Sequence, residues 1–322
     1  MPRKRNVHKN NAAGRFAGAK LQSAMEYLMT YGWAILIIAV VLGALFQLGV
    51  FNANNFAPKA PPGSCQVFRP NGPYTTSFIN LEGICSGEIP QYVANFSQSP
   101  AGYIVANAPP ATMSQITVVF WINPVNNGYW GNSGNYWENA ISGSSGCGNN
   151  YYFFIEAGHN PPAESWGVIN SAFKDSPGVP LAPNTWQQLV GTYNGSALLI
   201  YLNGKQIGSP FTASESSIPV TNAIITFNGV TISGTKPVTS GGGCNPISGN
   251  LANIQIYNTS LSANDIQALY LEGIGGAPID LQNLVAWWPL NGNANDYSGN
   301  GNNGAPTNVV FVSNWWSGYT PP

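Results

Sequence analysis

The feature that most constrains this chain is an uncharged, hydrophobic segment near its N-terminus, from Tyr27 to Phe51. A helix needs about 20 residues to cross a bilayer core, whereas the apolar core of a secretory signal is usually about 7–15 residues long. The segment is therefore too long for an ordinary cleaved signal, and no small-x-small cleavage motif follows it. We predict a transmembrane or assembly helix over residues 22–51. A linker over residues 52–63 follows, because its prolines must stop the helix.

Charged residues are distributed unevenly around this segment. Residues 1–21 contain six of the 11 basic residues, and all 12 acidic residues come later. A basic flank stays in the cytoplasm under the positive-inside rule, so residues 1–21 are expected to be a cytoplasmic leader and the C-terminal part to be extracellular. The basic run is a weak argument for nucleic-acid binding, since a hydrophobic segment follows at once and the rest of the chain is acidic. We expect no nucleic-acid partner.

Two further features mark the start of the hydrophobic segment. Glu26 stands directly before the apolar run, and a carboxylate there is costly in a membrane unless it has a partner. Ala39 and Gly43 are four residues apart, a spacing that allows helices to pack closely. Together with LQSAMEYLMTYGWAILIIAVV, these features resemble the class III signal peptides of archaeal type IV pilin-like proteins.

The resemblance implies how the N-terminus is processed and used. A prepilin-type peptidase would cut between Leu21 and Gln22, so the helix would stay in the mature protein. The carboxylate of Glu26, as fifth mature residue, would pair with the Gln22 ammonium of a neighbouring subunit in a filament. Leu21 departs from the family, which usually has glycine before the cut. Two alternatives stay open: Glu26 stabilises the start of the helix through the helix dipole, or the helix anchors a monomeric receptor.

The chain has four cysteines, all of which follow the hydrophobic segment: Cys65, Cys85, Cys147 and Cys244. An even number of cysteines outside the cell indicates disulfide bonds. Three connectivities are open, and we favour Cys65–Cys85 and Cys147–Cys244 because each pair then lies within one predicted unit. The spacing of Cys and His does not fit zinc.

From about Gln115, short runs of alternating apolar and polar residues are separated by turns every 8–12 residues, which is typical of antiparallel β structure. Asn203-Gly204 and Asn228-Gly229 predict tight hairpins. Ser262, followed by Asp265, predicts the start of a short helix.

The runs TWQQLVGTYNGSALLIYLNGKQIG and GNLANIQIYNTSLSANDIQALY resemble the laminin G-like, concanavalin A-like jelly-roll family over residues 93–272. The predicted fold class is therefore mainly β: a long N-terminal hydrophobic helix, then an extracellular antiparallel β-sandwich.

Two segments flank the predicted sandwich. Residues 64–92 are expected to form a small collar bounded by cysteines. Residues 273–322 contain LVAWWPLNGNANDYSGNGNNG, which resembles the opening strand and first loop of the same family but stands near the C-terminus. This segment either completes the sandwich in place or begins a second copy that is cut short. We favour completion, because residues 305–322 are too few for a second sandwich.

Catalytic residues are not expected. Glucan-cleaving enzymes on this sandwich carry closely spaced acids of the form E-x-D-x-x-E, and no such run occurs here. The acids of the exported region are scattered: Glu138, Glu156, Glu164, Asp175 and Glu215. His159 has no nucleophile elbow near it and is expected to be a hydrogen-bonding loop residue. We therefore expect no enzyme, with an extracellular glycosidase as the least favoured function.

The candidate binding residues are of three kinds. Asp296 and Asn293 offer oxygen ligands for which the resemblance implies calcium, although an Asn-Gly turn cluster without metal explains them equally well. Trp130, Trp137 and Trp166 lie in loop-like sequence and are expected to stack on sugar rings or to pack on a neighbouring subunit. Sequons that allow N-glycosylation begin at Asn95, Asn194 and Asn258.

Together these patterns predict a pilin-like surface protein, assembled through its N-terminal helix and displaying a lectin-like adhesion domain. Its expected location is a single pass through the membrane, or a pilus, with the N-terminus cytoplasmic and the C-terminal domain outside. The expected partners are the membrane, other copies in a filament, a prepilin-type peptidase and a glycan. Calcium is the one cofactor considered. The alternative is a monomeric, membrane-anchored, carbohydrate-binding receptor.

Overall fold

The computed structural model describes residues 13–47 and most of residues 65–322. The gaps within the second range are 73–74, 76–79, 84, 86–88, 98–99, 108–111, 126–136, 145–150, 159–162, 169–177, 214–217, 220–223, 228–229, 233–235, 239–243 and 246–247. Several further residues, including those of the strands between 137 and 168, are described by their backbone alone. The chain divides into two compact units, residues 1–59 and residues 60–322, and each is described by itself.

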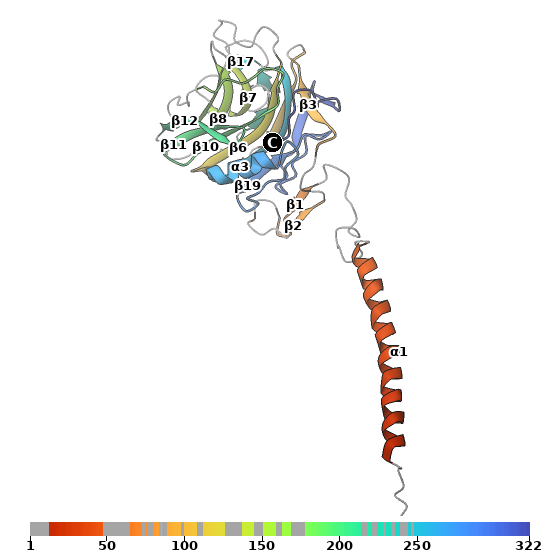
Figure 1. The fold of residues 1–322 in the computed structure, drawn as a ribbon. Helices are drawn as coiled ribbons and strands as arrows, with labels where there is room; N and C mark the ends of the chain where they lie inside the picture. The colour runs from red at the N-terminus through yellow and green to blue at the C-terminus, as the bar shows by residue number, and fades with distance from the viewer. Residues whose placement is uncertain are drawn as a thin grey trace, which may run out of the picture. The chain divides into compact units, whose positions relative to one another are not determined.

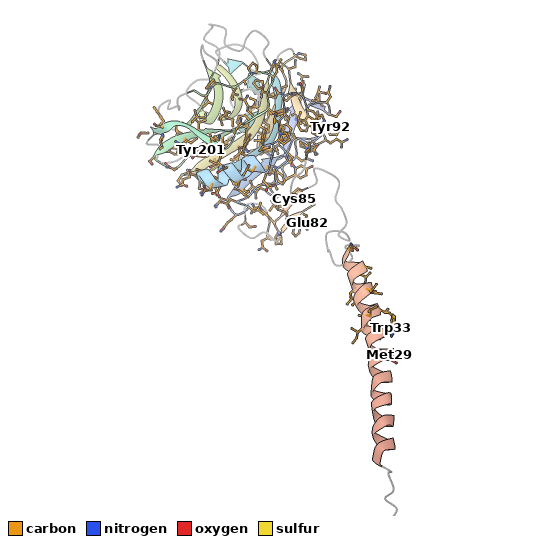
Figure 2. All side chains as sticks on the ribbon, in the orientation of Figure 1. Met29, Trp33, Glu82, Cys85, Tyr92 and Tyr201 are labelled. Atoms are coloured by element: carbon orange, nitrogen blue, oxygen red, sulfur yellow. A yellow bond between two sulfur atoms is a disulfide. The ribbon has the colours of Figure 1, made fainter. Side chains whose placement is uncertain are left out.

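The first unit contains one continuous helix, α1 (Ala13–Gln47) (Figure 1). Its side chains are described from residue 29, and the large apolar ones are exposed: Met29 is 68% and Trp33 is 65% accessible to solvent (Figure 2). Among the helices that the structure describes, none combines the length and the hydrophobicity needed to cross a membrane. Parts of the predicted span, residues 22–28 and 48–51, lie outside the residues whose side chains are described, so the transmembrane helix over residues 22–51 stays a prediction. The helix also begins before Gln22, so the predicted boundary at that residue is not a break in secondary structure.

The second unit is built around two sheets (Figure 1). The first sheet has the strand order β12-β11-β10-β6-β18-β3-β21, and β19 lies beside β18. All its pairings are antiparallel. Its strands are β3 (Val93–Phe96), β6 (Ile116–Pro124), β10 (Gln187–Tyr193), β11 (Ala197–Leu202), β12 (Lys205–Thr212), β18 (Gly249–Tyr257), β19 (Leu284–Trp288) and β21 (Val310–Val312).

The second sheet has the order β20-β4-β14-β7-β8-β9, with β17 parallel to β7. Its strands are β4 (Tyr103–Asn107), β7 (Trp137–Ser144), β8 (Tyr151–Gly158), β9 (Ala163–Val168), β14 (Ile224–Phe227), β17 (Cys244–Asn245) and β20 (Gly304–Thr307). Three two-stranded pairs complete the β structure: β1 (Gln66–Phe68) with β2 (Asn80–Glu82), β5 (Thr112–Met113) with β13 (Ile218–Pro219), and β15 (Val230–Ile232) with β16 (Lys236–Val238). The predicted mainly antiparallel jelly roll is confirmed.

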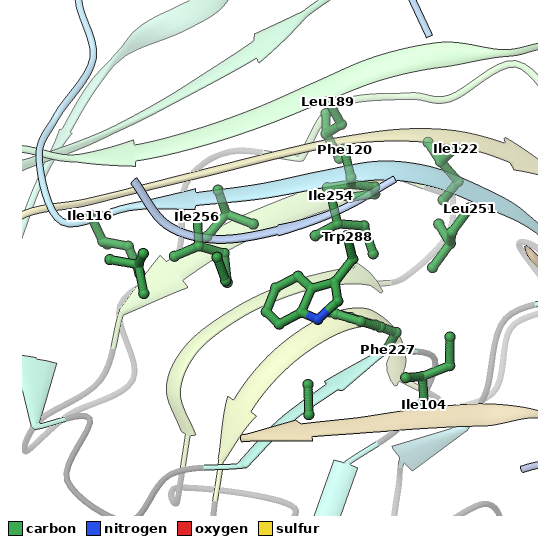
Figure 3. Close-up of a cluster of buried hydrophobic side chains, with 14 of the residues drawn as sticks. Ile104, Ile116, Phe120, Ile122, Leu189, Phe227, Leu251, Ile254, Ile256 and Trp288 are labelled. Carbon is green, nitrogen blue, oxygen red and sulfur yellow. The ribbon is translucent and has the colours of Figure 1, made fainter. Parts of the chain in front are cut away.

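The main core lies between the two sheets. Ile116, Val118, Phe120 and Ile122 alternate along β6 and are all buried on the inner face, as their spacing predicts. Trp288 packs against these residues and lies edge-on to Phe227 of the opposite sheet, with ring centroids 4.9 Å apart (Figure 3). These contacts remove apolar surface from water, which is the main stabilising term of such a sandwich.

A second layer covers the outer face of the first sheet. Val119 packs there in a cluster with residues of helix α3 (Ala263–Leu271). Trp121 packs in a second cluster with Trp315, which lies near the C-terminus. Strand β6 is therefore buried on both faces. Two of its outward-pointing residues, Val119 and Trp121, are apolar for the same reason that its inward-pointing residues are. The other two, Thr117 and Asn123, are polar and donate hydrogen bonds to the backbone carbonyls of Thr259 and Ser317.

The local predictions that fall on described residues are confirmed. Asn203 and Gly204 both have positive φ, 49° and 73°, and join β11 to β12 in a hairpin. Ser262 caps α3 and forms a capping box with Asp265. The predicted turn at 228–229 lies outside the described residues.

The C-terminal segment contributes strands to both sheets. β19 pairs with β18 and β21 pairs with β3 in the first sheet, and β20 pairs with β4 in the second. This is the arrangement that completion of the sandwich in place requires.

The N-terminal part of the second unit is the predicted collar. A disulfide bond joins Cys65 to Cys85, with their Cα atoms 5.1 Å apart, and this is the pairing that the sequence favours. Cys147 lies outside the described residues. Only the backbone of Cys244 is described, in β17 beside Trp137. The second predicted disulfide stays a prediction.

Candidate functional site

The loop between β19 and β20 contains the residues predicted to hold calcium. Asp296 accepts backbone N–H groups with both carboxylate oxygens: Oδ1 from Trp287 and Ser298, each at 2.9 Å, and Oδ2 from Asn302 at 2.8 Å. Three N–H groups satisfy most of the hydrogen-bonding capacity of a carboxylate. They also direct the positive ends of their dipoles toward the position where a cation would have to bind.

Asn293 is likewise engaged within the loop. Its Oδ1 accepts the N–H of Asn295 at 2.9 Å, and its Nδ2 donates to the hydroxyl of Tyr297 at 3.0 Å. Within the described part of the chain, no group of three or more His, Cys, Asp or Glu side chains could hold a metal ion. Calcium also takes amide and backbone carbonyl oxygens, so calcium at Asp296 and Asn293 stays a prediction, and no step of the proposed function depends on it.

Two other asparagines of this loop satisfy backbone carbonyls of β19. Asn300 Nδ2 donates to the carbonyls of Leu284 and Val285 at 3.0 and 2.8 Å, and Asn302 Nδ2 donates to that of Val285 at 3.0 Å. Both asparagines are buried. In this loop, asparagine side chains therefore supply hydrogen bonds that backbone N–H groups would otherwise supply, because a short amide side chain can donate to a nearby backbone carbonyl.

Arg69 ties the collar to this loop. Its buried guanidinium donates to the carbonyls of Ser298 at 3.0 Å, Leu281 at 2.8 Å and Leu284 at 3.2 Å, and also to that of Thr75. Burial lowers the pKa of this guanidinium, whereas the negative charge of Asp296 raises it. A cation that donates to four carbonyls has a fixed structural role, and no pattern in the sequence predicts this role for Arg69.

A small pocket lies beside the collar, lined in part by Cys65, Asn253 and Trp287. Its cavity volume is about 20 Å³, which is room for about one water molecule and not for a sugar ring. Its polar lining is already satisfied: Asn253 Oδ1 accepts from Trp287 Nε1 at 2.8 Å and from Gln255 Nε2 at 3.0 Å. This pocket belongs to the core and is not the binding site.

Two of the three tryptophans predicted to lie in ligand-binding loops lie in strands instead. Trp137 begins β7, and Trp166 lies within β9 opposite Ile155 of β8. Their backbones pair in the second sheet because aromatic and β-branched neighbours favour strands, so the expectation that they lie in loops is wrong. Trp130 lies outside the described residues.

The scattered acids are partly brought together by this sheet. Glu138 of β7 and Glu164 of β9 both lie opposite Ala157 of β8, so the three residues are in register across three strands. Glu156 lies one position earlier in β8. The predicted positions Asp175, Glu215 and His159 fall outside the described residues.

The sequons differ in their surroundings. Asn95 lies within β3, and its Nδ2 donates to Asn250 Oδ1 at 2.7 Å. Asn194 is exposed at the β10–β11 turn, where its Oδ1 accepts hydrogen bonds from Ser196 and Ala197, and Asn258 is exposed after β18. Asn194 and Asn258 are therefore the better candidate acceptors, and glycosylation stays a prediction.

The residues of the predicted cleavage and assembly site, Leu21, Gln22 and Glu26, all lie within α1. Their side chains are outside the described ones, so the predicted roles stay predictions.

An aromatic cluster at the C-terminus is the feature that the sequence did not predict. Trp315 is buried, stacks on Trp316 with ring centroids 4.4 Å apart, and lies edge-on to Trp186 and Tyr319. Trp316 is 51% exposed. The doublet in NWWSGY could have drawn attention to this cluster, but a tryptophan pair more often indicates core.

Comparisons with known proteins agree with this architecture. A protein-family profile described as the concanavalin A-like lectin/glucanases superfamily matches residues 98–267, which is more than half of the chain. A comparison with curated proteins gave no match.

Two solved structures have a similar fold. A putative carbohydrate binding protein from Bacteroides ovatus has a TM-score of 0.50 and 16% identity, over 69% of this chain and 60% of that protein. A heptameric SAP-like pentraxin from Limulus polyphemus has a TM-score of 0.51 and 14% identity, over 70% of this chain and 95% of the pentraxin. At these identities the likeness shows the fold and does not identify a ligand.

Proposed function

Because the chain belongs to the concanavalin A-like lectin/glucanase superfamily, we propose that its sandwich is a carbohydrate-binding module without catalytic activity, displayed at the cell surface. The observation that carries this proposal is the two-sheet sandwich itself, to which the C-terminal strands β19, β20 and β21 contribute. Families on this fold use it to bind sugars or to cleave them, so the choice between the two depends on the side chains of the individual chain.

Composition supports a neutral glycan as the ligand. Only 7% of the residues are charged, which is far below the average of about a quarter. Amides, hydroxyls and aromatic rings, which are abundant here, are the groups that hydrogen-bond sugar hydroxyls and stack on sugar rings. An anionic glycan would need a basic surface, and five of the 11 basic residues are spread over residues 22–322.

A glycan array tests this proposal directly. The full-length chain, purified in detergent, is expected to bind a restricted set of neutral glycans in a concentration-dependent way. Binding that is confined to sulfated or sialylated glycans would contradict the assignment of a neutral ligand. Absence of binding to every glycan on the array, by a chain with a cooperative thermal transition, would contradict the function.

The N-terminal unit carries the second part of the proposal, which is assembly into a filament. Cleavage before Gln22 by a prepilin-type peptidase would leave the part of α1 from Gln22 onward in the mature protein. This part of the helix would pack against copies of itself, with Glu26 paired to a neighbour's Gln22 ammonium. The resemblance to pilin-like proteins supports this, as does the exposure of large apolar side chains on α1, which need lipid or other helices to cover them. The membrane is the expected site of the precursor.

Replacement of Glu26 separates the filament hypothesis from its alternative, a monomeric anchored receptor. We expect Glu26→Ala to abolish surface filaments while the amount of the protein in the membrane stays unchanged. Glu82→Ala, which removes an exposed acid of the collar, is the matched control and should leave filaments intact. Filaments that survive Glu26→Ala, or a surface protein that begins at Met1, would favour the receptor.

One observation keeps a glycosidase as a second candidate. Glu138 and Glu164 lie in register with one strand between them, so their backbones are two strand spacings apart, about 10 Å. The carboxyl groups of inverting glycosidases are about 6.5–9.5 Å apart. A hydrolysis screen on β-glucans is expected to show no turnover, and turnover that disappears in both Glu138→Gln and Glu164→Gln would establish the enzyme instead.

A further inference from the structure

The C-terminal turn presents a flat aromatic surface. Trp316 stacks on Trp315 with the ring planes only 17° apart, so one face of the Trp316 indole is covered by Trp315. Trp316 is nevertheless 51% exposed, while Trp315 is 2% exposed. The stack is therefore oriented with its inner ring in the core and its outer ring toward solvent.

The inner ring of this stack is held rigidly. Trp315 Nε1 donates to the carbonyl of Pro90 at 3.1 Å, and the Trp315 carbonyl accepts from Trp186 Nε1 at 2.9 Å. The edges of Trp186 and Tyr319 pack against the same indole, with centroids 5.8 and 5.6 Å away. A platform that is already ordered costs little conformational entropy when a ligand binds to it.

The turn itself is fixed against a neighbouring loop. The N–H of Tyr319 donates to the Trp316 carbonyl at 3.1 Å, and the N–H of Trp186 donates to the Gly318 carbonyl at 2.8 Å. Gly318 has a φ of 78°, and a Cβ there would lie 2.2 Å from the backbone oxygen of Asn184. Only glycine allows this approach, which brings the exposed residues Asn184 and Thr185 beside the turn that carries Trp316.

The two segments that supply the turn and the neighbouring loop are polar and uncharged. Asn184, Thr185, Asn314 and Ser317 are all exposed. Residues 176–204 and 297–322, which supply the turn and the neighbouring loop, contain no Asp, Glu, Lys or Arg. An open indole face bordered by amides and hydroxyls matches the chemistry of a pyranose ring, which has an apolar C–H face and hydroxyls around its edge. It does not match a charged peptide or a phosphate, which would need ion pairs.

We propose that Trp316, backed by Trp315, is the platform on which this protein binds a sugar ring of a neutral glycan. The proposal rests on the proposed carbohydrate-binding function and gives that function a location. The ring would stack on the outer indole face while Asn184, Thr185 and Ser317 hydrogen-bond its hydroxyls. Asn123 supports the turn from below, because its Nδ2 donates to the Ser317 carbonyl at 3.2 Å.

The test compares variants of the full-length chain against the neutral glycan that the wild type binds best on an array. Trp316→Ala is expected to weaken binding by about tenfold or more, which is the usual effect of truncating a central tryptophan anchor. Trp316→Phe is expected to lose less, because it keeps a flat aromatic face. Leu271→Ala is the matched control, since Leu271 is also an exposed apolar residue, at 63%, and is expected to bind like wild type.

The outcomes separate this proposal from the function on which it rests. If the wild type binds a glycan and Trp316→Ala binds it equally well, the platform is wrong and the carbohydrate-binding function stands. If the wild type binds no glycan, both are wrong. If Trp316→Ala loses binding but also loses the cooperative thermal transition of the wild type, Trp316→Phe decides: wild-type folding with intermediate affinity supports the platform, and wild-type affinity overturns it.

Discussion

At the scale of single residues, the chain uses amide and carboxylate side chains where other proteins use backbone partners or metals. Asp296 accepts three backbone N–H groups, and Asn300 and Asn302 donate to two carbonyls of β19. The same residue types would serve as calcium ligands if their oxygens were directed inward to a common point. Composition alone could not distinguish the two, because Asp and Asn suit both purposes.

The Asp296→Asn variant measures how much this arrangement stabilises the fold. In the variant, an NH₂ group replaces one of the two carboxylate oxygens. This NH₂ group cannot accept a hydrogen bond, so at least one backbone N–H that Asp296 accepts would lose its partner. We expect the free energy of unfolding to fall by about 1–3 kcal/mol, the usual cost of an unsatisfied buried group. Urea unfolding of the full-length chain in detergent measures this change, with Glu82→Gln as the exposed control.

The same measurement addresses calcium. Because the loop is closed by its own hydrogen bonds, we expect the unfolding midpoint of the wild type to be unchanged by calcium or by EDTA. A midpoint that rises with calcium, and does so only when Asp296 is present, would contradict the account of this loop.

Buried tyrosines determine how stability responds to alkali. Tyr257 is fully buried, and burial raises the pKa of its phenol above the ordinary value near 10. Above about pH 10 the unfolded chain loses this proton while the folded chain keeps it, so stability falls as pH rises, by up to about 1.4 kcal/mol per pH unit for one tyrosine. Below that pH the contribution is fully present.

Urea midpoints between pH 8 and 11 check this expectation. The wild type should be steady at the lower end and lose stability above about pH 10. Tyr257→Phe should be less stable at pH 8, because Tyr257 donates to Gln255 Oε1 at 2.6 Å, but its decline above pH 10 should be shallower. Equal slopes for the two proteins would show that Tyr257 does not govern the alkaline response.

At the scale of elements, the fold depends on strands that are distant in sequence. β18 pairs along one side with β6, and along the other with both β3 and β19. β19 supplies Trp288, which is completely buried between the sheets. The C-terminal segment therefore forms part of the core of the sandwich that precedes it.

Truncation tests this dependence. A chain that lacks residues 279–322 would lose β19, β20, β21 and the aromatic cluster, and would expose the inner face that Trp288 covers. We expect it to show no cooperative thermal transition, whereas a chain that lacks only the exposed residues 320–322 should unfold like wild type. A long truncation that keeps the wild-type melting temperature would mean that the sandwich is complete without this segment.

The elements also show which features a sequence can reveal. The hairpin at Asn203-Gly204 and the cap at Ser262 depend on adjacent residues, so local pattern was sufficient to predict them. The burial of the outer face at Trp121 depends on Tyr319, which is far along the chain and lies edge-on to it at 5.8 Å. The exposure of Trp316 also depends on residues that are distant in sequence. Trp315 is held by hydrogen bonds to Trp186 and Pro90, and this determines which way the Trp316 ring faces, so no local pattern could predict it.

At the scale of the whole molecule, two units with different chemistry are joined in one chain. Residues 1–59 contain a helix with exposed apolar side chains, and residues 60–322 contain a sandwich that is poor in charge and rich in amides. The first suits association with lipid or with other helices, and the second suits recognition of neutral, hydroxyl-rich ligands. A surface protein that assembles through one unit and binds glycans through the other accounts for both.

Calorimetric titration of the full-length chain with the neutral glycan selected on an array tests the central claim most directly. With EDTA present throughout, we predict a saturable heat of binding with one glycan bound per chain, and the same affinity when calcium replaces EDTA. A titration without saturable heat, or binding that appears only with calcium, would contradict the account.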